Sequence, residues 1–123
     1  METNDYILEA KRYIDNAKEI LSEKAKKQDG YYTDVKYVKM AGHRAYTGVL
    51  LALDGVFGKK ARGRKDIDWY RQQTQKWNRK LLPVLNSTYE ILHLSLGYDG
   101  AQDARIAHIG FENAEKIIKA AES

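Results

Sequence analysis

The chain has 123 residues, of which 43% are apolar and 31% charged, and a net charge of +4. This composition is typical of a soluble globular protein and excludes a disordered tail or a collagen. At this length we expect one domain over residues 1–123 with a real core. The longest uninterrupted apolar run, Val49 to Leu53, is too short to cross a bilayer.

The N-terminal residues and the cysteine content bear on the cellular compartment. Met1 is followed by Glu2, Asn4 and Asp5 and not by a basic and then apolar stretch, so no secretory signal is expected. The chain has no cysteine, which excludes disulfides, thiolate nucleophiles and Cys-ligated zinc. We therefore expect a cytoplasmic protein that does not associate with membranes.

Two amphipathic helices are predicted in the first half of the chain. Between about residues 4 and 27, apolar residues recur at steps of three and four, and Gln28, Asp29 and Gly30 end this pattern. With Thr33 or Asp34 as N-cap, a second helix is predicted to about residue 57. Its apolar residues form two stripes, one large and one small, so we expect it to touch more than one neighbour. The small stripe consists of Ala41, Ala45, Gly48, Ala52 and Gly55.

A third long helix is predicted from Asp66, its N-cap, to Gly97, which favours a helix end. Pro83 interrupts the pattern, and a proline there either kinks one long helix or begins a new one. We favour the kink. A last helix is predicted from about residue 102 to residue 121.

These elements predict an all-α fold, because no strand-like alternation is present. Four long helices with short connections favour an antiparallel up-down-up-down four-helix bundle. In this arrangement the first helix ends, the second begins, the third ends and the fourth begins at one pole of the bundle. The opposite pole then holds residues 58–65 and the chain termini.

Several segments together resemble a family of small bacterial proteins classed as a domain of unknown function. They are residues 10–18 (AKRYIDNAK), 36–43 (KYVKMAGH), 89–93 (YEILH) and 97–100 (GYDG). That family is in turn distantly similar to HEPN domains, helical bundles that include nucleotide-binding partners of nucleotidyltransferases and metal-independent ribonucleases. HEPN ribonucleases carry an arginine and, after four to six residues, a histidine. Here Arg105 and His108 are separated by only two residues, so no catalytic residue carries over.

The first candidate site is a cluster of tyrosine and histidine side chains expected at one pole. Histidine suits proton transfer near neutral pH, and tyrosine adds ring surface and a hydroxyl, so this cluster suits a planar or phosphorylated ligand. The alternative is that the tyrosines only cap the core. The candidate residues are Tyr31, Tyr32, Tyr37, His43, Tyr89, His93, Tyr98 and Asp99.

A metal site in the bundle core is not expected, and no cofactor is predicted. Glu90 and His93 have the Glu-x-x-His spacing of di-iron bundles, but those sites need a second such pair and further inward glutamates. No serine lies in a context that would activate its hydroxyl.

The second candidate site is basic. From Lys59 to Lys80 there are nine Lys or Arg and two Asp, whereas the rest of the chain has twelve Lys or Arg and fifteen acids. Basic residues beside an aromatic ring suit phosphate contacts and base stacking, although a solvated loop is the alternative. The candidate nucleic-acid-binding residues are Lys59, Lys60, Arg62, Arg64, Lys65, Trp69, Lys76, Arg79 and Lys80.

The leading functional hypothesis is therefore a non-catalytic helical binding protein that acts with a protein partner or as a homodimer. The alternative is a HEPN-like domain that binds nucleotides or nucleic acid, with ribonuclease activity as a variant of that hypothesis. Polarised positive charge favours the second hypothesis, and the unmatched arginine–histidine spacing favours the first.

Overall fold

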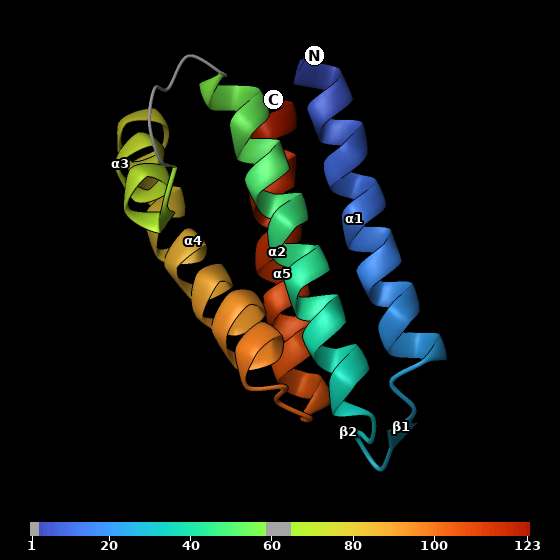
Figure 1. Cartoon of the computed structure of the whole chain (residues 1–123). Coiled ribbons are helices and arrows are strands. Elements are labelled where there is room, and N and C mark those ends of the chain that lie inside the picture. Colours follow the sequence, from blue (N-terminus) through green and yellow to red (C-terminus); the bar gives the residue numbers. More distant parts are fainter. Residues whose placement is uncertain (1–2, 59–64) are drawn as a thin grey trace.

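The structure, a computed structural model, describes residues 3–58 and 65–123, and helix dominates it (Figure 1). The predicted all-α character is confirmed. A short 3₁₀ turn, η1 (Arg79–Leu81), and a π-helix, η2 (Tyr89–Tyr98), accompany the α-helices. The α-helices are α1 (Thr3–Glu23), α2 (Val35–Phe57), α3 (Ile67–Trp77), α4 (Leu82–Thr88) and α5 (Ala104–Glu122). Among these described helices, none combines the length and the apolar character that a membrane span requires.

Helix α2 lies at the centre of the molecule. It packs against α1 on one side and against η2 and α5 on the other, while α5 also packs against α4. Figure 1 shows α1, α2 and α5 running side by side, with α4 and η2 beside them. Val38, Val49 and Leu53 of α2 are at most 1% exposed, as are Leu92 and Ile117 of the neighbouring helices. The expectation that the second helix touches several neighbours is confirmed.

A small β-hairpin replaces the predicted end of the first helix. Helix α1 ends at Glu23, not at about residue 27, and β1 (Lys27–Gln28) pairs antiparallel with β2 (Tyr31–Tyr32). The two residues between the strands, Asp29 and Gly30, have φ of 54° and 84°. A two-residue turn with positive φ at both positions matches the twist of paired strands, and Asp-Gly is well suited to it. The break at these residues was predicted, but the strand pairing was not.

The predicted third helix is divided near residue 78, and the expected kink at Pro83 is wrong. Helix α3 ends at Trp77, and Asn78 is extended, with φ −155° and ψ 90°. Pro83 lies in the first turn of α4, the other outcome considered for this residue. The fixed φ of proline suits a first helical turn, where its missing N–H would have no partner in any case. The Asp66 N-cap is confirmed, because its side chain accepts a hydrogen bond from the Trp69 amide at 2.9 Å.

The segment from residue 89 to residue 98 is a π-helix, although the apolar spacing predicts an α-helix. π-Helices are rare, usually only one turn long, and often lie at functional sites. After η2 the chain turns at Gly100, which has φ 67°, and α5 begins at Ala104. Its N-cap is Asp103, whose carboxylate accepts a hydrogen bond from the Arg105 amide. The last helix therefore begins two residues later than predicted.

Candidate functional site

The predicted tyrosine and histidine residues come from the hairpin, from α2 and from η2 with the residue after it. Tyr31 is 51% exposed on the hairpin, whereas the Tyr32 ring is buried and its carbonyl accepts a hydrogen bond from the Gln102 side chain. Tyr37 lies at the start of α2, and Asp99 is exposed just beyond η2. The hairpin is bonded to the residues just after η2, because the Tyr32 amide donates a hydrogen bond to the Gln102 carbonyl at 2.8 Å. That these four residues surround a common site stays a prediction.

Four of the predicted residues do lie together, with one residue that was not predicted. His43 and Tyr46 of α2 meet Tyr89, His93 and Tyr98 of η2, and we call these five residues the ring cluster. The His93 ring stacks on Tyr46 at 4.7 Å between centroids and lies 5.1 Å from Tyr89 and from Tyr98. His43 lies 5.9 Å from His93 and from Tyr98. His93 is therefore the centre of the ring cluster.

Two glycines and the π-helix explain why these rings meet. A Cβ atom added to Gly42 would lie 2.6 Å from the Gly97 backbone nitrogen, so the η2 backbone approaches α2 as closely as it can. A Cβ atom on Gly97 would lie 3.0 Å from the His43 ring, so this glycine leaves room for the imidazole. In a π-helix residues five apart are bonded neighbours, which brings Tyr98 over His93. In an α-helix these two side chains would point to different sides.

Burial changes the acid–base behaviour of the ring cluster. Burial, reinforced by the neighbouring His43, lowers the pKa of His93 below its ordinary value of 6.5. Burial, reinforced by Tyr89, raises the pKa of Tyr46 to about 12. At neutral pH the cluster therefore contains a neutral His93 imidazole and an uncharged Tyr46 phenol. The His93 Nδ1 atom is buried without a hydrogen-bond partner among the described residues.

A basic surface lies beside the ring cluster, on the exposed side of α2. Between residues 35 and 53 the sequence has three cations and no Asp or Glu. Lys36, Lys39 and Arg44 are all exposed, and we call their surface the α2 face. Lys36 and Lys24 lie 5.4 and 5.7 Å from the Tyr37 ring. These contacts place one cation of α2 and one cation from the end of α1 beside the same ring.

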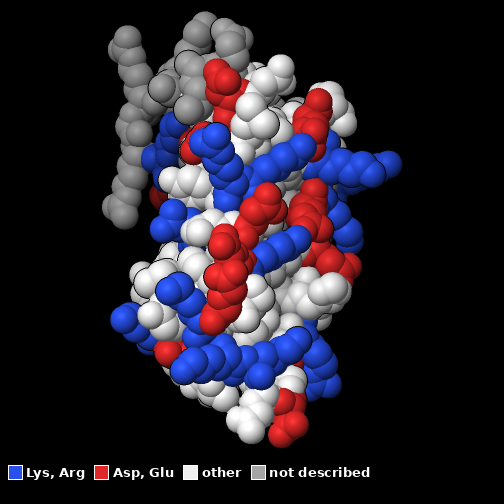
Figure 2. Space-filling model, turned by 90° about the vertical axis from the view of Figure 1, so that its right-hand side faces the viewer, with Lys and Arg blue, Asp and Glu red and all other residues white. Residues whose placement is uncertain are grey.

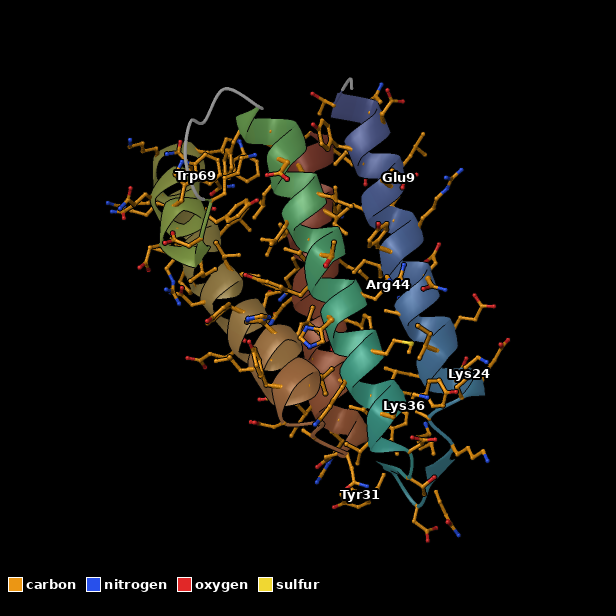
Figure 3. The ribbon with its side chains drawn as sticks, viewed as in Figure 1. Glu9, Lys24, Tyr31, Lys36, Arg44 and Trp69 are labelled. Carbon is orange, nitrogen blue, oxygen red and sulfur yellow. The ribbon has the colours of Figure 1, made fainter. Side chains whose placement is uncertain are left out.

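A shallow hollow of about 480 Å³ opens on the α2 face. Arg44 extends over it toward α1, where its guanidinium lies 5.3 Å from the Tyr13 ring (Figure 3). The hollow places Arg44 beside His43, an exposed residue of the ring cluster. Its lining is Tyr13, Met40, His43, Arg44 and Thr47.

The α2 face was not predicted from the sequence, because its three cations are spread over residues 36–44 and do not form a dense basic run. The signal for this surface in the sequence is the absence of Asp and Glu between residues 35 and 53. Only one side of a mostly buried helix reaches solvent, so a few cations without acids make that side basic. Among the described residues, no ion pair to Lys36, Lys39 or Arg44 is present. These cations are thus available to an external anion.

The predicted basic region is only partly described. Lys59, Lys60, Arg62 and Arg64 lie outside the described residues. Lys65 is directed inward, at 3.4 Å from an Asp54 carboxylate oxygen and 5.4 Å from the Trp69 ring. The Trp69 ring is half-buried and makes edge contacts with Phe57 and Tyr70, so base stacking on it stays a prediction. Lys76, Arg79 and Lys80 are exposed, as predicted.

A second hollow, of about 470 Å³, lies between α1 and α5. Figure 2 shows that acidic and basic side chains alternate on the face that contains α1. Lys18 pairs with Glu115, and Lys11 pairs with Glu122 at 3.1 Å, so the cations here already have acidic partners. His108 lies at the edge of the hollow and pairs with Glu112 at 2.8 Å. This surface is less suited to an anionic ligand than the α2 face.

Comparison with known proteins agrees with the resemblance found in the sequence. The family model described as "Domain of unknown function (DUF5618)" matches residues 5–123. The chain belongs to this family. Among solved structures, it is similar to a protein of unknown function from Dyadobacter fermentans, with 52% identity and a TM-score of 0.95. The match covers 99% of this chain and 98% of that chain. Among curated proteins, none matches this chain.

Proposed function

We propose that this DUF5618 protein is a small binding protein without catalysis of its own, and that its α2 face binds single-stranded nucleic acid. The observation that supports this proposal most is the set of three exposed cations on α2, close to aromatic rings and within a stretch of sequence that has no Asp or Glu. This proposal retains the non-catalytic role and combines it with the nucleic-acid alternative. It moves the binding surface from residues 59–80 to α2.

The cations of the α2 face suit phosphate groups. Lys36, Lys39 and Arg44 are spread along about two turns of α2, with Arg44 on the side of α1 and Lys39 on the side of Gly100. A phosphate backbone carries a charge at every nucleotide, and a row of cations binds it by releasing condensed counterions. The acidic and basic residues of the α1 face offer no such row.

The exposed rings suit unpaired bases. Tyr98 is 62% exposed, and it lies at the end of the ring cluster nearest to His43. Each base has a π-face, so any base that is not paired in a duplex can stack on a tyrosine or histidine ring. Such stacking depends little on the base sequence. A single strand therefore fits this surface better than a duplex.

The ribonuclease alternative has less support than binding. His108 is paired with Glu112 on α5 and lies outside the α2 face, while Arg105 is held by Asp103 at 2.9 Å. We therefore expect single-stranded RNA to be recovered intact after incubation with the protein in the absence of metal.

The salt dependence of binding tests this proposal. A fluorescein-labelled oligouridine should bind at low salt, measured by fluorescence anisotropy, and lose affinity steeply as salt rises. The triple variant Lys36→Ser/Lys39→Ser/Arg44→Ser should make the slope of log K against log salt less steep by about 2, since each contact with a single strand contributes about 0.7.

A second triple variant, Lys76→Ser/Arg79→Ser/Lys80→Ser, is the matched control because it removes the same charge from an exposed surface near α3. We expect it to leave the slope unchanged. Equal losses in the two variants would indicate unspecific attraction and contradict the assignment to α2. Absence of binding at low salt, with elution of the protein as a dimer, would favour the protein-partner hypothesis instead.

A further inference from the structure

Ion pairs join α1 to α5 at two levels of the face that these helices form. Lys11 pairs with Glu122 at 3.1 Å, and Lys18, two helical turns farther along α1, pairs with Glu115. Residue numbers rise along one helix and fall along the other, so α1 and α5 are antiparallel. Each of the four side chains is about half exposed, so both pairs remain open to an external group.

A third level of opposite charge lies between these two pairs. Asp15 and Lys119 are exposed and line a smaller hollow of about 190 Å³ between α1 and α5. Each helix therefore carries three charges of alternating sign, and the two helices have opposite signs at every level. We call these charges the α1 series and the α5 series. The α1 series is Lys11, Asp15 and Lys18, and the α5 series is Glu122, Lys119 and Glu115.

We propose that the face formed by α1 and α5 binds a second copy of this chain, with the α1 series of each copy against the α5 series of the other. A two-fold axis parallel to the helices produces this arrangement, because it sets α1 of one copy opposite α5 of the other at the same level. Lys18 then meets Glu115 of the second copy, and every other level likewise joins opposite charges. A two-fold axis across the helices would instead set α1 against α1 and bring Lys11 to Lys18 of the second copy, which is repulsive.

The ion pairs within one chain do not prevent ion pairs between two chains. An ammonium group has three donor hydrogens, and a carboxylate has two acceptor oxygens. Lys18 can therefore keep Glu115 of its own chain and also bind Glu115 of the second copy. Four charged groups then form a network at each level, and networks stabilise a contact more than isolated exposed pairs do.

The face also has the extent of an interface. Helix α1 has 21 residues and α5 has 19. At about 1.5 Å per residue, their common face is about 30 Å long and roughly 20 Å wide. A standard interface uses a patch of this order, with about 800 Å² of accessible surface per partner. Ile109, next to His108 at the edge of the 470 Å³ hollow, is 50% exposed and adds an apolar side chain that a second copy can cover.

This inference goes beyond nucleic-acid binding and does not depend on it. The α2 face lies on the other side of α1, where Arg44 contacts the Tyr13 ring. A dimer through α1 and α5 thus leaves the α2 face open. Failure of oligouridine to bind would not affect this inference, and a monomeric protein would not affect the proposed function.

Sedimentation velocity of charge-swap variants at low salt tests this inference, and we expect the unmodified protein to sediment as a dimer. The variant Lys11→Glu/Lys18→Glu makes its α1 series wholly acidic. The variant Glu115→Lys/Glu122→Lys makes its α5 series wholly basic. Each variant alone should dimerise more weakly by more than about tenfold, because like charges face each other between the copies. A mixture of the two variants should restore the dimer, because each acidic series then meets a basic one.

Lys76→Glu/Lys80→Glu is the matched control, because it makes the same change of net charge as the first variant on the exposed surface of α3 and η1. It should dimerise as the unmodified protein does. A monomeric unmodified protein, full dimerisation of either charge-swap variant alone, or a mixture that stays monomeric would each overturn the inference. An equal loss of the dimer in the control would do the same.

A second measurement needs no substitution. When ¹⁵N-labelled unmodified protein is diluted at low salt, the amide signals of residues 11–18 and 115–122 should shift as the dimer dissociates. The signals of residues 76–80 should remain in place. Shifts on dilution that spare residues 11–18 and 115–122 would assign the interface elsewhere and overturn the inference.

Discussion

Gly42 and Gly97 are the residues that allow α2 and η2 to touch. Glycine in the interior of a helix normally costs about 0.5–1 kcal/mol relative to alanine, so each needs a compensating contact. Gly42 has one, because a Cβ atom there would lie 2.7 Å from the Leu92 carbonyl oxygen and from the Leu96 Cβ atom. The ring cluster depends on this close approach.

Gly42→Ala should therefore destabilise the protein, although the same change in an unconstrained helix is stabilising. We expect a loss of about 1–3 kcal/mol, the range for overpacking a well-packed site. Urea unfolding followed by circular dichroism measures this quantity. A gain in the free energy of unfolding would show that α2 and η2 are farther apart than described.

The depressed pKa of His93 predicts a pH dependence of stability. The native state holds the His93 proton less readily than the unfolded state, whose ordinary pKa is 6.5. The neutral His93 thus makes its full contribution to the free energy of unfolding above pH 6.5, and this free energy falls as the pH drops below that value. His93→Gln should reduce the fall in urea midpoint between pH 7.5 and 5.5, and His108→Gln, at an exposed site, should not. An equal fall in the two variants would exclude His93 as its source.

At the scale of the elements, apolar periodicity predicted α1, α2 and α5 with small errors at their ends. It failed where the backbone departs from α-geometry. Asp29 and Gly30 have positive φ angles, and the turn that they make pairs two short strands. In η2 the hydrogen bonds follow an i to i+5 pattern, and over ten residues apolar spacing does not distinguish such a π-helix from an α-helix. The helix predicted over residues 66–97 is interrupted at the extended residue Asn78, and Pro83 lies in the first turn of α4.

The buried stripe of α2 is the prediction that matters most for stability. Leu53 is 1% exposed between α1 and the helices on the other side of α2, so Leu53→Ala should cost about 2–5 kcal/mol. Leu8→Ala is the matched control, because Leu8 is 60% exposed and should change stability by less than about 0.5 kcal/mol. Thermal and urea unfolding compare the two variants. Similar losses would mean that the buried face of α2 is assigned wrongly.

At the scale of the whole molecule, the faces that contain α1 and α2 differ in the charges that they carry. The face that contains α1 carries pairs such as Lys18–Glu115, whereas the α2 face carries cations only. The sequence predicted His43, Tyr89, His93 and Tyr98 as site residues, but not that Tyr46 and Arg44 would join them. These residues are far apart in the chain, and only the contact between α2 and η2 brings their side chains together.

An NMR titration tests the central claim, that the α2 face is the binding surface, most directly. Oligouridine added to ¹⁵N-labelled protein at low salt should shift the amide signals of residues 36–47 and of Tyr98, because phosphates and bases are expected to bind there. The signals of residues 76–80, on the other basic surface, should remain in place. Shifts confined to residues 76–80, or no shifts at saturating oligouridine, would contradict the account.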